Sequence, residues 1–154
     1  MWERFRRFSV LERPAQSLFL RAMLLLPVVS LSLRWRGFRV TQAALQRFVA
    51  NSNEKKDCSN AGERAKLTAH MVYAADRHGL IHSTCLALSL TLWWLLERQG
   101  IESHLRVGIR KEEGEFEAHA WVERDGVALN EPEEHHQHYA AFDAVLSSLP
   151  TDEA

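Results

Sequence analysis

The spacing of apolar residues predicts a helical first half of the chain. Apolar residues recur every three to four positions over Glu12–Leu26, Thr41–Ala50 and Leu67–Ala75, which is typical of helices with one buried face. The first of these runs continues into Pro27, and we expect a pair of buried helices that is broken at this proline. The polar stretch Asn51–Asn60 predicts a loop before the third helix.

The pattern changes in the second half. Ser83 or Thr84 can cap a helix that is apolar on every side, and Gly100 is placed to end it, so this helix is predicted to be buried. Beyond Gly100 apolar and polar residues alternate, which predicts strands at 105–110, 116–123 and 127–131, the last two joined by a turn at Asp125-Gly126. The sequence therefore predicts an α+β fold, with N-terminal helices and a buried central helix against an antiparallel hairpin sheet.

The composition fits one globular domain over residues 1–154. The chain is 46% hydrophobic and 25% charged, with 7 Gly and 4 Pro, which excludes disorder and low complexity. We interpret residues 1–60 as a helical extension and residues 61–149 as the core. The net charge is −1, but it is divided unevenly. Residues 1–77 carry 14 basic and 6 acidic side chains, and residues 78–154 carry 5 basic and 14 acidic ones, which indicates either a basic docking surface or an attraction between the two halves.

The cysteine and hydropathy patterns indicate a cytoplasmic protein. Cys58 and Cys85 are the two cysteines, which is too few for a disulfide scaffold and gives no C-x-x-C pair for zinc. The apolar run at 18–33 is shorter than a membrane span and contains Arg21. We therefore expect a buried helix pair here, with a peripheral membrane contact as the less favoured alternative.

Cys85 and His119 are the candidate catalytic residues. Cys85 is predicted in the first turn of the buried helix, where backbone N–H groups and the helix dipole stabilise a thiolate. His119 is predicted on a strand, on one face with Trp121 and Glu123. A cysteine at a helix N-terminus with a strand histidine is typical of thiol hydrolases. Taken separately, Cys85 would be interpreted as a small buried side chain and His119 as a surface histidine, and it is the pair that favours catalysis.

A third residue would orient the imidazole, and the returning strand offers two. If Asp125-Gly126 is a two-residue loop, Asn130 lies opposite Trp121 and shares the face of His119. If the loop has three residues, His119 instead pairs with Glu131. Both residue types can accept an imidazole N–H.

Several segments together resemble a known family. Thr84-Cys85-Leu86, the segment 116–123 with the sequence F-E-A-H-A-W-V-E, and Gly126–Asn130 are similar to the lasso peptide leader peptidases, small cysteine proteases of the transglutaminase-like superfamily. The resemblance implies a papain-like or transglutaminase-like core over residues 61–149. It implies Cys85 as nucleophile, His119 as base and Glu131 as the acidic third residue, with Asn130 as the alternative.

The resemblance also implies a reaction and partners. The reaction would be removal of the leader from a ribosomally made precursor in the cytoplasm, without a cofactor or a metal. The implied partners are the precursor, a separate leader-recognition protein and an ATP-dependent macrolactam cyclase. A transglutaminase-like acyl transferase and a non-catalytic peptide-binding module are the alternatives.

Two further clusters carry weaker signals. His135, His136 and His138 with Glu133 and Glu134 could bind a divalent metal, but adjacent histidines in an acidic loop more often titrate in solvent. We therefore expect no metal at this cluster. The segment Trp2–Phe8 interleaves aromatic residues with arginine, as nucleic-acid binders do. Because the sequence pI is near 6.7 and no recognition motif is present, we also expect no binding of nucleic acid.

Overall fold

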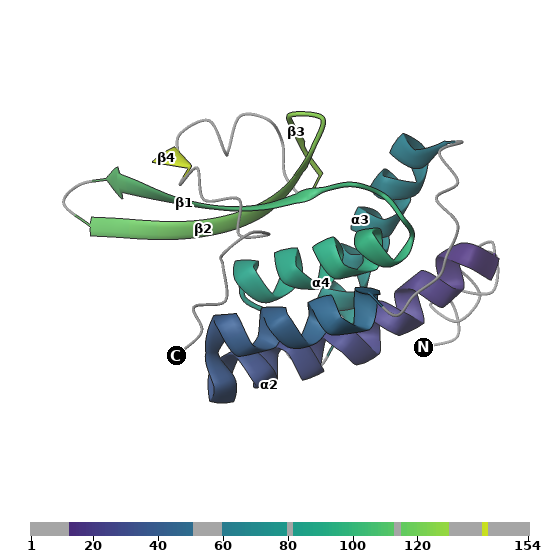
Figure 1. Cartoon of the computed structure of the whole chain (residues 1–154), viewed down its shortest axis with the longest axis horizontal. Helices are drawn as coiled ribbons and strands as arrows, with labels where there is room; N and C mark the ends of the chain where they lie inside the picture. The colour runs from purple at the N-terminus through teal and green to yellow at the C-terminus, as the bar shows by residue number, and fades with distance from the viewer. Residues whose placement is uncertain (1–12, 51–59, 80–81, 113–114, 130–139, 142–154) are drawn as a thin grey trace.

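The chain folds into helices stacked beneath one antiparallel sheet, which confirms the predicted α+β class (Figure 1). The computed structural model describes residues 13–50, 60–79, 82–112, 115–129 and 140–141. In Figure 1, α4 lies between the sheet and α2, and the buried core joins side chains of α2, α3 and α4 to the sheet. The described elements are α2 (Arg13–Ala50), α3 (Ala61–His78), α4 (Cys85–Arg98), β1 (His104–Glu112), β2 (Glu115–Arg124), β3 (Val127–Ala128) and β4 (Ala140–Ala141).

The first helix, α2, reverses direction at Gly37 and not at Pro27. Gly37 has φ 78° and ψ 177°, a backbone conformation that is open essentially only to glycine. The Thr41 hydroxyl donates to the Gly37 carbonyl and accepts from the Ser32 hydroxyl, both at 2.8 Å. In a straight helix Ser32 and Thr41 would lie about 13 Å apart, so this contact requires the chain to turn back.

The predicted break at Pro27 is therefore wrong. Proline inside a helix removes one backbone hydrogen bond and usually kinks the helix. Here core residues on both sides of Pro27, namely Ala22, Leu26 and Val29, remain fully packed, and this packing keeps the helix continuous. The two arms of α2 are thus 13–36 and 38–50, joined at Gly37.

We expect Gly37→Ala to lower the free energy of unfolding by about 1–3 kcal/mol, because the new side chain would force an unfavourable backbone conformation. A Cβ at Gly37 would have no atom within 4 Å, so the loss would come from the backbone and not from a clash. Gly62→Ala is the matched control. Gly62 is helical, and its Cβ would meet only Arg124 at an ordinary 3.7 Å, so this variant should gain up to about 1 kcal/mol. Urea unfolding measures both, and equal stability of the two variants would contradict the assignment of strain to Gly37.

The central helix α4 has the ends that the sequence predicts. Thr84 is the N-cap, and its hydroxyl accepts from the Ala87 N–H at 3.3 Å. At the other end Gly100 has φ 69°, and the Gly100 and Ile101 N–H groups bond back to the carbonyls of Glu97 and Leu96 at 3.0 Å, as at a glycine C-cap. The helix is buried from Ala87 to Leu96 except at Leu88 and Trp94, as its uniform apolarity predicts.

α4 is fixed to the other helices by side-chain hydrogen bonds as well as by apolar packing. The Trp94 indole N–H donates to the Leu45 carbonyl at 3.0 Å, which ties α4 to the second arm of α2. The Gln99 amide donates to the Thr68 hydroxyl on α3 at 2.9 Å. These contacts hold α4 in place beneath the sheet.

The strands form a sheet in the order β3-β2-β1-β4 among the described residues. β1 and β2 pair antiparallel from His104↔Glu123 to Glu112↔Glu115, so both extend into the segment 111–115 that the sequence predicted as a loop. β2 and β3 pair at Glu123↔Ala128 and Arg124↔Val127. The predicted strand 127–131 is described only as far as Ala128, and the short strand β4 was not predicted.

Candidate active site

Cys85 is the first residue of α4 and a half-buried free cysteine. The Leu88 N–H bonds to the Thr84 carbonyl at 3.0 Å, and the Ala87 N–H is taken by the Thr84 side chain. The N–H groups of Cys85 and Leu86 are the ones for which the helix itself provides no acceptor. The helix N-terminus therefore presents two backbone donors and a partial positive charge next to the thiol.

The loop before Cys85 is attached to α3. The Ser83 N–H donates to the Asp76 carboxylate at 2.8 Å, two residues before the cysteine. Asp76 is in the last turn of α3. This bond fixes where the chain enters α4 and so fixes the position of the thiol.

A buried hydrogen bond joins the first turns of α4 to the strand that carries His119. The hydroxyl of Ser89, which is fully buried, donates to the Ala120 carbonyl at 2.8 Å. Ser89 lies one helical turn after Cys85 on the same side of the helix, and Ala120 directly follows His119. The bond therefore holds the N-terminal part of α4 against β2 beside the histidine.

α4 and β2 run in the same direction along the sheet, so the start of α4 lies beside the first half of β2. The loop 101–103 and the helix C-cap join the end of α4 to His104, and His104 pairs with Glu123 at the end of β2. The C-terminus of α4 is thus next to the C-terminal end of β2. The N-terminus of α4, which is Cys85, therefore lies toward the first half of β2, and Figure 1 shows α4 and β2 side by side.

The two faces of β2 differ in their neighbours. Val122 is fully buried in the core with residues of α4, so Ala120 and Val122 face the helix, while Ala118 on the same face of the strand is exposed. His119 lies on the other face with Trp121, and their rings are stacked with centroids 6.1 Å apart and an interplanar angle of 12°. The Nε2 atom of His119 is buried.

The helix reaches β2 at an edge of that strand. The Val122 carbonyl accepts from Leu129 on the β3 side at 2.9 Å, and carbonyls two residues apart point to the same edge of a strand. The Ala120 carbonyl, which Ser89 contacts, therefore lies at this edge, beyond Ala128 where the described part of β3 ends. α4 and the side chain of His119 thus lie on opposite faces of β2, and the Ser89–Ala120 bond joins the helix to the strand at this edge.

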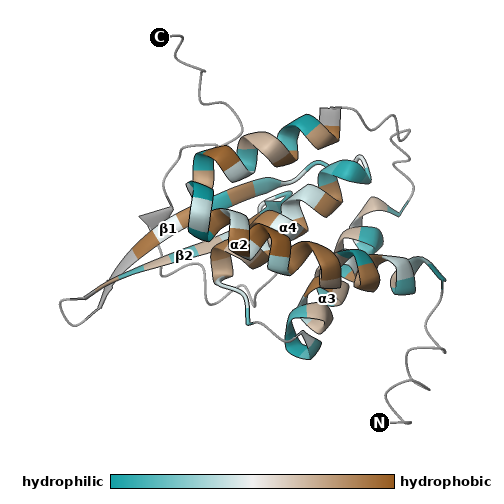
Figure 2. Ribbon diagram, turned by 90° about the horizontal axis from the view of Figure 1, so that it is seen from below, coloured by the Kyte–Doolittle hydropathy of each residue, from teal (hydrophilic) through white to brown (hydrophobic). Residues whose placement is uncertain are grey.

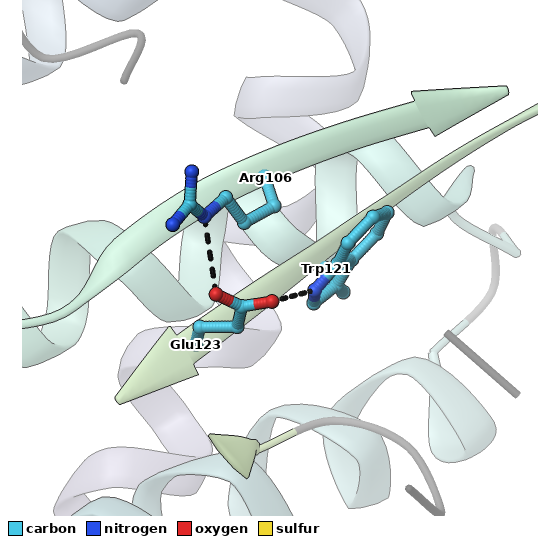
Figure 3. Close-up of polar contacts among 3 residues, drawn as sticks. All are labelled: Arg106, Trp121 and Glu123. Atoms are coloured by element: carbon cyan, nitrogen blue, oxygen red, sulfur yellow. Dashed lines mark hydrogen bonds and ion pairs between the residues drawn. The ribbon is translucent and has the colours of Figure 1, made fainter. Parts of the chain in front are cut away.

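A cluster of hydrogen-bonded polar side chains lies on the same face of β2 as His119. Figure 3 shows this cluster. Glu123 accepts from the Trp121 indole N–H at 2.8 Å and from Arg106 at 3.1 Å. Arg106 comes from β1 and pairs directly with Trp121 in the register. The Glu123 carboxylate thus fixes the indole ring of Trp121, a residue that is only 1% exposed. The imidazole of His119 stacks against this ring.

Sequence analysis placed His119, Trp121 and Glu123 on one face but missed Arg106. The alternation over 104–110 shows that Arg106 points to the polar side of its strand. Only the β1–β2 register brings it opposite Trp121. The register depends on where the turn between β1 and β2 falls, and the sequence pattern alone does not determine that position.

We expect Glu123→Gln to reduce the turnover of a reaction that depends on His119 about tenfold while leaving KM nearly unchanged. The amide keeps the size of the side chain but weakens the charge-assisted bonds that orient Trp121 and, through it, His119. Asp125→Asn is the matched control. It removes a carboxylate from an exposed ion pair with Arg124 and keeps a side chain that tolerates positive φ. Steady-state kinetics should separate the two variants, and equal losses would contradict a positioning role for Glu123.

The other predicted site residues lie outside the described residues. These are the candidate third residues Asn130 and Glu131, together with Cys58, the segment Trp2–Phe8 and the cluster Glu133, Glu134, His135, His136 and His138. The turn before Asn130 is described. Asp125 and Gly126 have φ of 52° and 78°, and the pairing Arg124↔Val127 makes it a two-residue loop, which is the case that the sequence argument linked to Asn130.

Comparison with known proteins gives one match. The family model described as transglutaminase-like superfamily matches residues 25–143, from the middle of α2 to just beyond β4. Neither the curated proteins nor the solved structures contain a significant match. The matched range includes Cys85, His119 and both candidates for the third residue.

Proposed function

This chain belongs to the transglutaminase-like superfamily, and from that premise we propose that it is a cysteine peptidase that removes the leader from a ribosomally synthesised lasso peptide precursor. One observation supports this proposal most. Cys85 begins a capped helix, and the buried Ser89–Ala120 bond fixes that helix beside the strand residue that follows His119. The resemblance of the segments around both residues to lasso peptide leader peptidases supplies the substrate class.

In the proposed reaction His119 takes the proton of the Cys85 thiol. The thiolate attacks the carbonyl carbon of the scissile peptide bond and forms a tetrahedral intermediate. The N–H groups of Cys85 and Leu86 stabilise its oxyanion, as donors at a helix N-terminus can. Collapse of the intermediate breaks the C–N bond, and the imidazolium gives its proton to the departing amine of the core peptide.

The second half of the cycle releases the leader. The leader is then bound to Cys85 as a thioester. His119 takes a proton from a water molecule, whose oxygen attacks the thioester carbonyl. The C–S bond breaks, the leader leaves with a new carboxylate, and the proton returns to the Cys85 sulfur.

The role of the third residue is open to a direct test. We propose that Glu131 accepts the second imidazole N–H, on the family resemblance, with Asn130 as the alternative that the two-residue turn favours. Loss of such an orienting group costs about 10⁴-fold in turnover in the serine protease triad. We therefore expect Glu131→Ala to be far slower than Asn130→Ala in a cleavage assay. The opposite ranking would assign the role to Asn130.

We propose that the peptidase acts in the cytoplasm with partners. A separate leader-recognition protein would present the precursor and raise its effective concentration to about the millimolar range. An ATP-dependent macrolactam cyclase would close the ring of the released core peptide. The reaction as proposed uses no cofactor.

A product mass assay tests the function. The purified chain is incubated with precursor and the leader-recognition protein, and the products are weighed by mass spectrometry. The expected result is two fragments whose masses sum to the precursor plus one water. A mass increase by an added amine, with ammonia lost, would show acyl transfer instead, and an unchanged precursor would favour a peptide-binding module.

A further inference from the structure

The first arm of α2 exposes a second apolar face. Five large apolar residues of this arm are exposed, at 53%, 74%, 62%, 49% and 76% in chain order. Their spacing of three to four residues places them within an arc of about 80° on the helix surface. We call them the α2 stripe: Leu20, Leu24, Val28, Leu31 and Trp35.

The α2 stripe is not needed for the packing of the fold. Ala22, Leu26 and Val29 of the same arm are buried in the core, and their positions lie on the opposite side of the helix from the stripe. Figure 2 looks at the molecule from the side of α2, and apolar residues follow this helix across the view. A row of exposed leucine, valine and tryptophan side chains on a folded chain marks an interaction site.

The charged side chains of α2 itself all have one sign. α2 contains no lysine, aspartate or glutamate, and its six arginines are all exposed. Arg21 and Arg34 border the stripe on its two sides, and Arg34 and Arg36 are next to Trp35. The arginines are Arg13, Arg21, Arg34, Arg36, Arg39 and Arg47.

We propose that the α2 stripe docks on an anionic lipid bilayer. A helix with aliphatic residues and tryptophan on one face, bordered by arginines and without acids, has the composition of helices that lie in the membrane interface. Trp35 beside Arg34 and Arg36 resembles the aromatic and basic anchors at the level of the lipid headgroups. An anionic lipid bilayer would contact the α2 stripe with its acyl chains and the arginines of α2 with its negatively charged headgroups.

The geometry of α2 favours lying on the bilayer over crossing it. The helix is apolar and long enough to be a candidate membrane span by length and composition alone. However, it bends at Gly37, and the stripe from Leu20 to Trp35 is about 22 Å long, less than the roughly 30 Å of a hydrocarbon core. The opposite face of the arm is also occupied by the protein core.

This proposal takes up the alternative that hydropathy and length left less favoured. Those two properties do not distinguish an apolar residue that packs in the core from one that faces outward. The exposed fractions do make this distinction. The proposal depends only on α2 and is independent of the peptidase activity.

The test is sedimentation of the full chain with vesicles, of phosphatidylcholine alone or mixed with phosphatidylglycerol. We expect binding to the mixed vesicles that weakens at higher salt, and little binding to phosphatidylcholine alone. Leu24→Glu should lower the ratio of bound to free protein by about tenfold or more, because it places a charge in the stripe. The matched control is Phe116→Glu, which makes the same change at a 72% exposed residue of β2 and should bind as the original chain does.

A second variant keeps the stripe intact. Arg34→Gln with Arg36→Gln should weaken binding to the mixed vesicles only, and circular dichroism confirms that each variant is folded. Equal losses for Leu24→Glu and Phe116→Glu, or no binding to either vesicle, would overturn the proposal. So would equal binding to both vesicle types. A dimer in light scattering that Leu24→Glu dissociates, without vesicle binding, would assign the stripe to a second copy of this chain.

Discussion

Cys85→Ala abolishes precursor cleavage, with kcat/KM reduced by about 10⁴-fold or more, if the thiol is the nucleophile. The reason is that the variant lacks the thiol that forms the acyl intermediate. The thermal midpoint should change little, since Cys85 is only half-buried and the cap at Thr84 remains. Mass spectrometry of the products and a thermal melt measure the two effects.

Cys58→Ala is the control for this experiment and should be nearly neutral. An electrophile that reacts with cysteine, such as iodoacetamide, gives an independent readout because it should inactivate the original chain and label Cys85. Cleavage retained by Cys85→Ala would contradict the peptidase proposal. The membrane docking proposed for α2 does not depend on that result.

The second large effect is expected at His119. His119→Ala should reduce turnover by about 10⁴-fold, because the thiol then has no base and the leaving amine has no acid. Binding of the precursor should be nearly unchanged, since the histidine acts on the proton and not on the peptide chain. Single-turnover cleavage and a direct binding measurement separate the two quantities.

His104→Ala is the matched control for this change. His104 is an exposed histidine on the same face of the sheet, at the far end of the β1–β2 pair. It should cleave at the original rate. Comparable losses at both positions would indicate that the variants act through the sheet and not through a catalytic imidazole.

The ends of the elements around the site were predictable because short signals specify them. Thr84 caps α4 with its own hydroxyl, and Gly100 ends it in a left-handed conformation, so both signals act within a few residues. The turn at Asp125-Gly126 is equally local. The α+β class follows from the change in apolar period and needs no long-range information.

The features that were missed depend on contacts between distant segments. A proline rule applied to Pro27 predicted a break, but packing of Leu26 and Val29 outweighs the lost hydrogen bond, and the reversal falls at Gly37. The Arg106–Glu123 pair requires the register of two strands. The exposure of the α2 stripe requires knowledge of which side of the helix meets the core, because both sides of this arm are apolar.

The hydrogen bonds that position α4 also have a consequence for how the chain folds. The α2 hairpin and the β1–β2 hairpin each form from neighbouring residues, which close rapidly. The bonds from Ser89 to Ala120 and from Trp94 to Leu45 join residues 31 and 49 positions apart, and such distant contacts form late because closing long loops is slow. The start of α4, with Cys85, is therefore expected to reach its place beside β2 only late in folding, after both hairpins have formed.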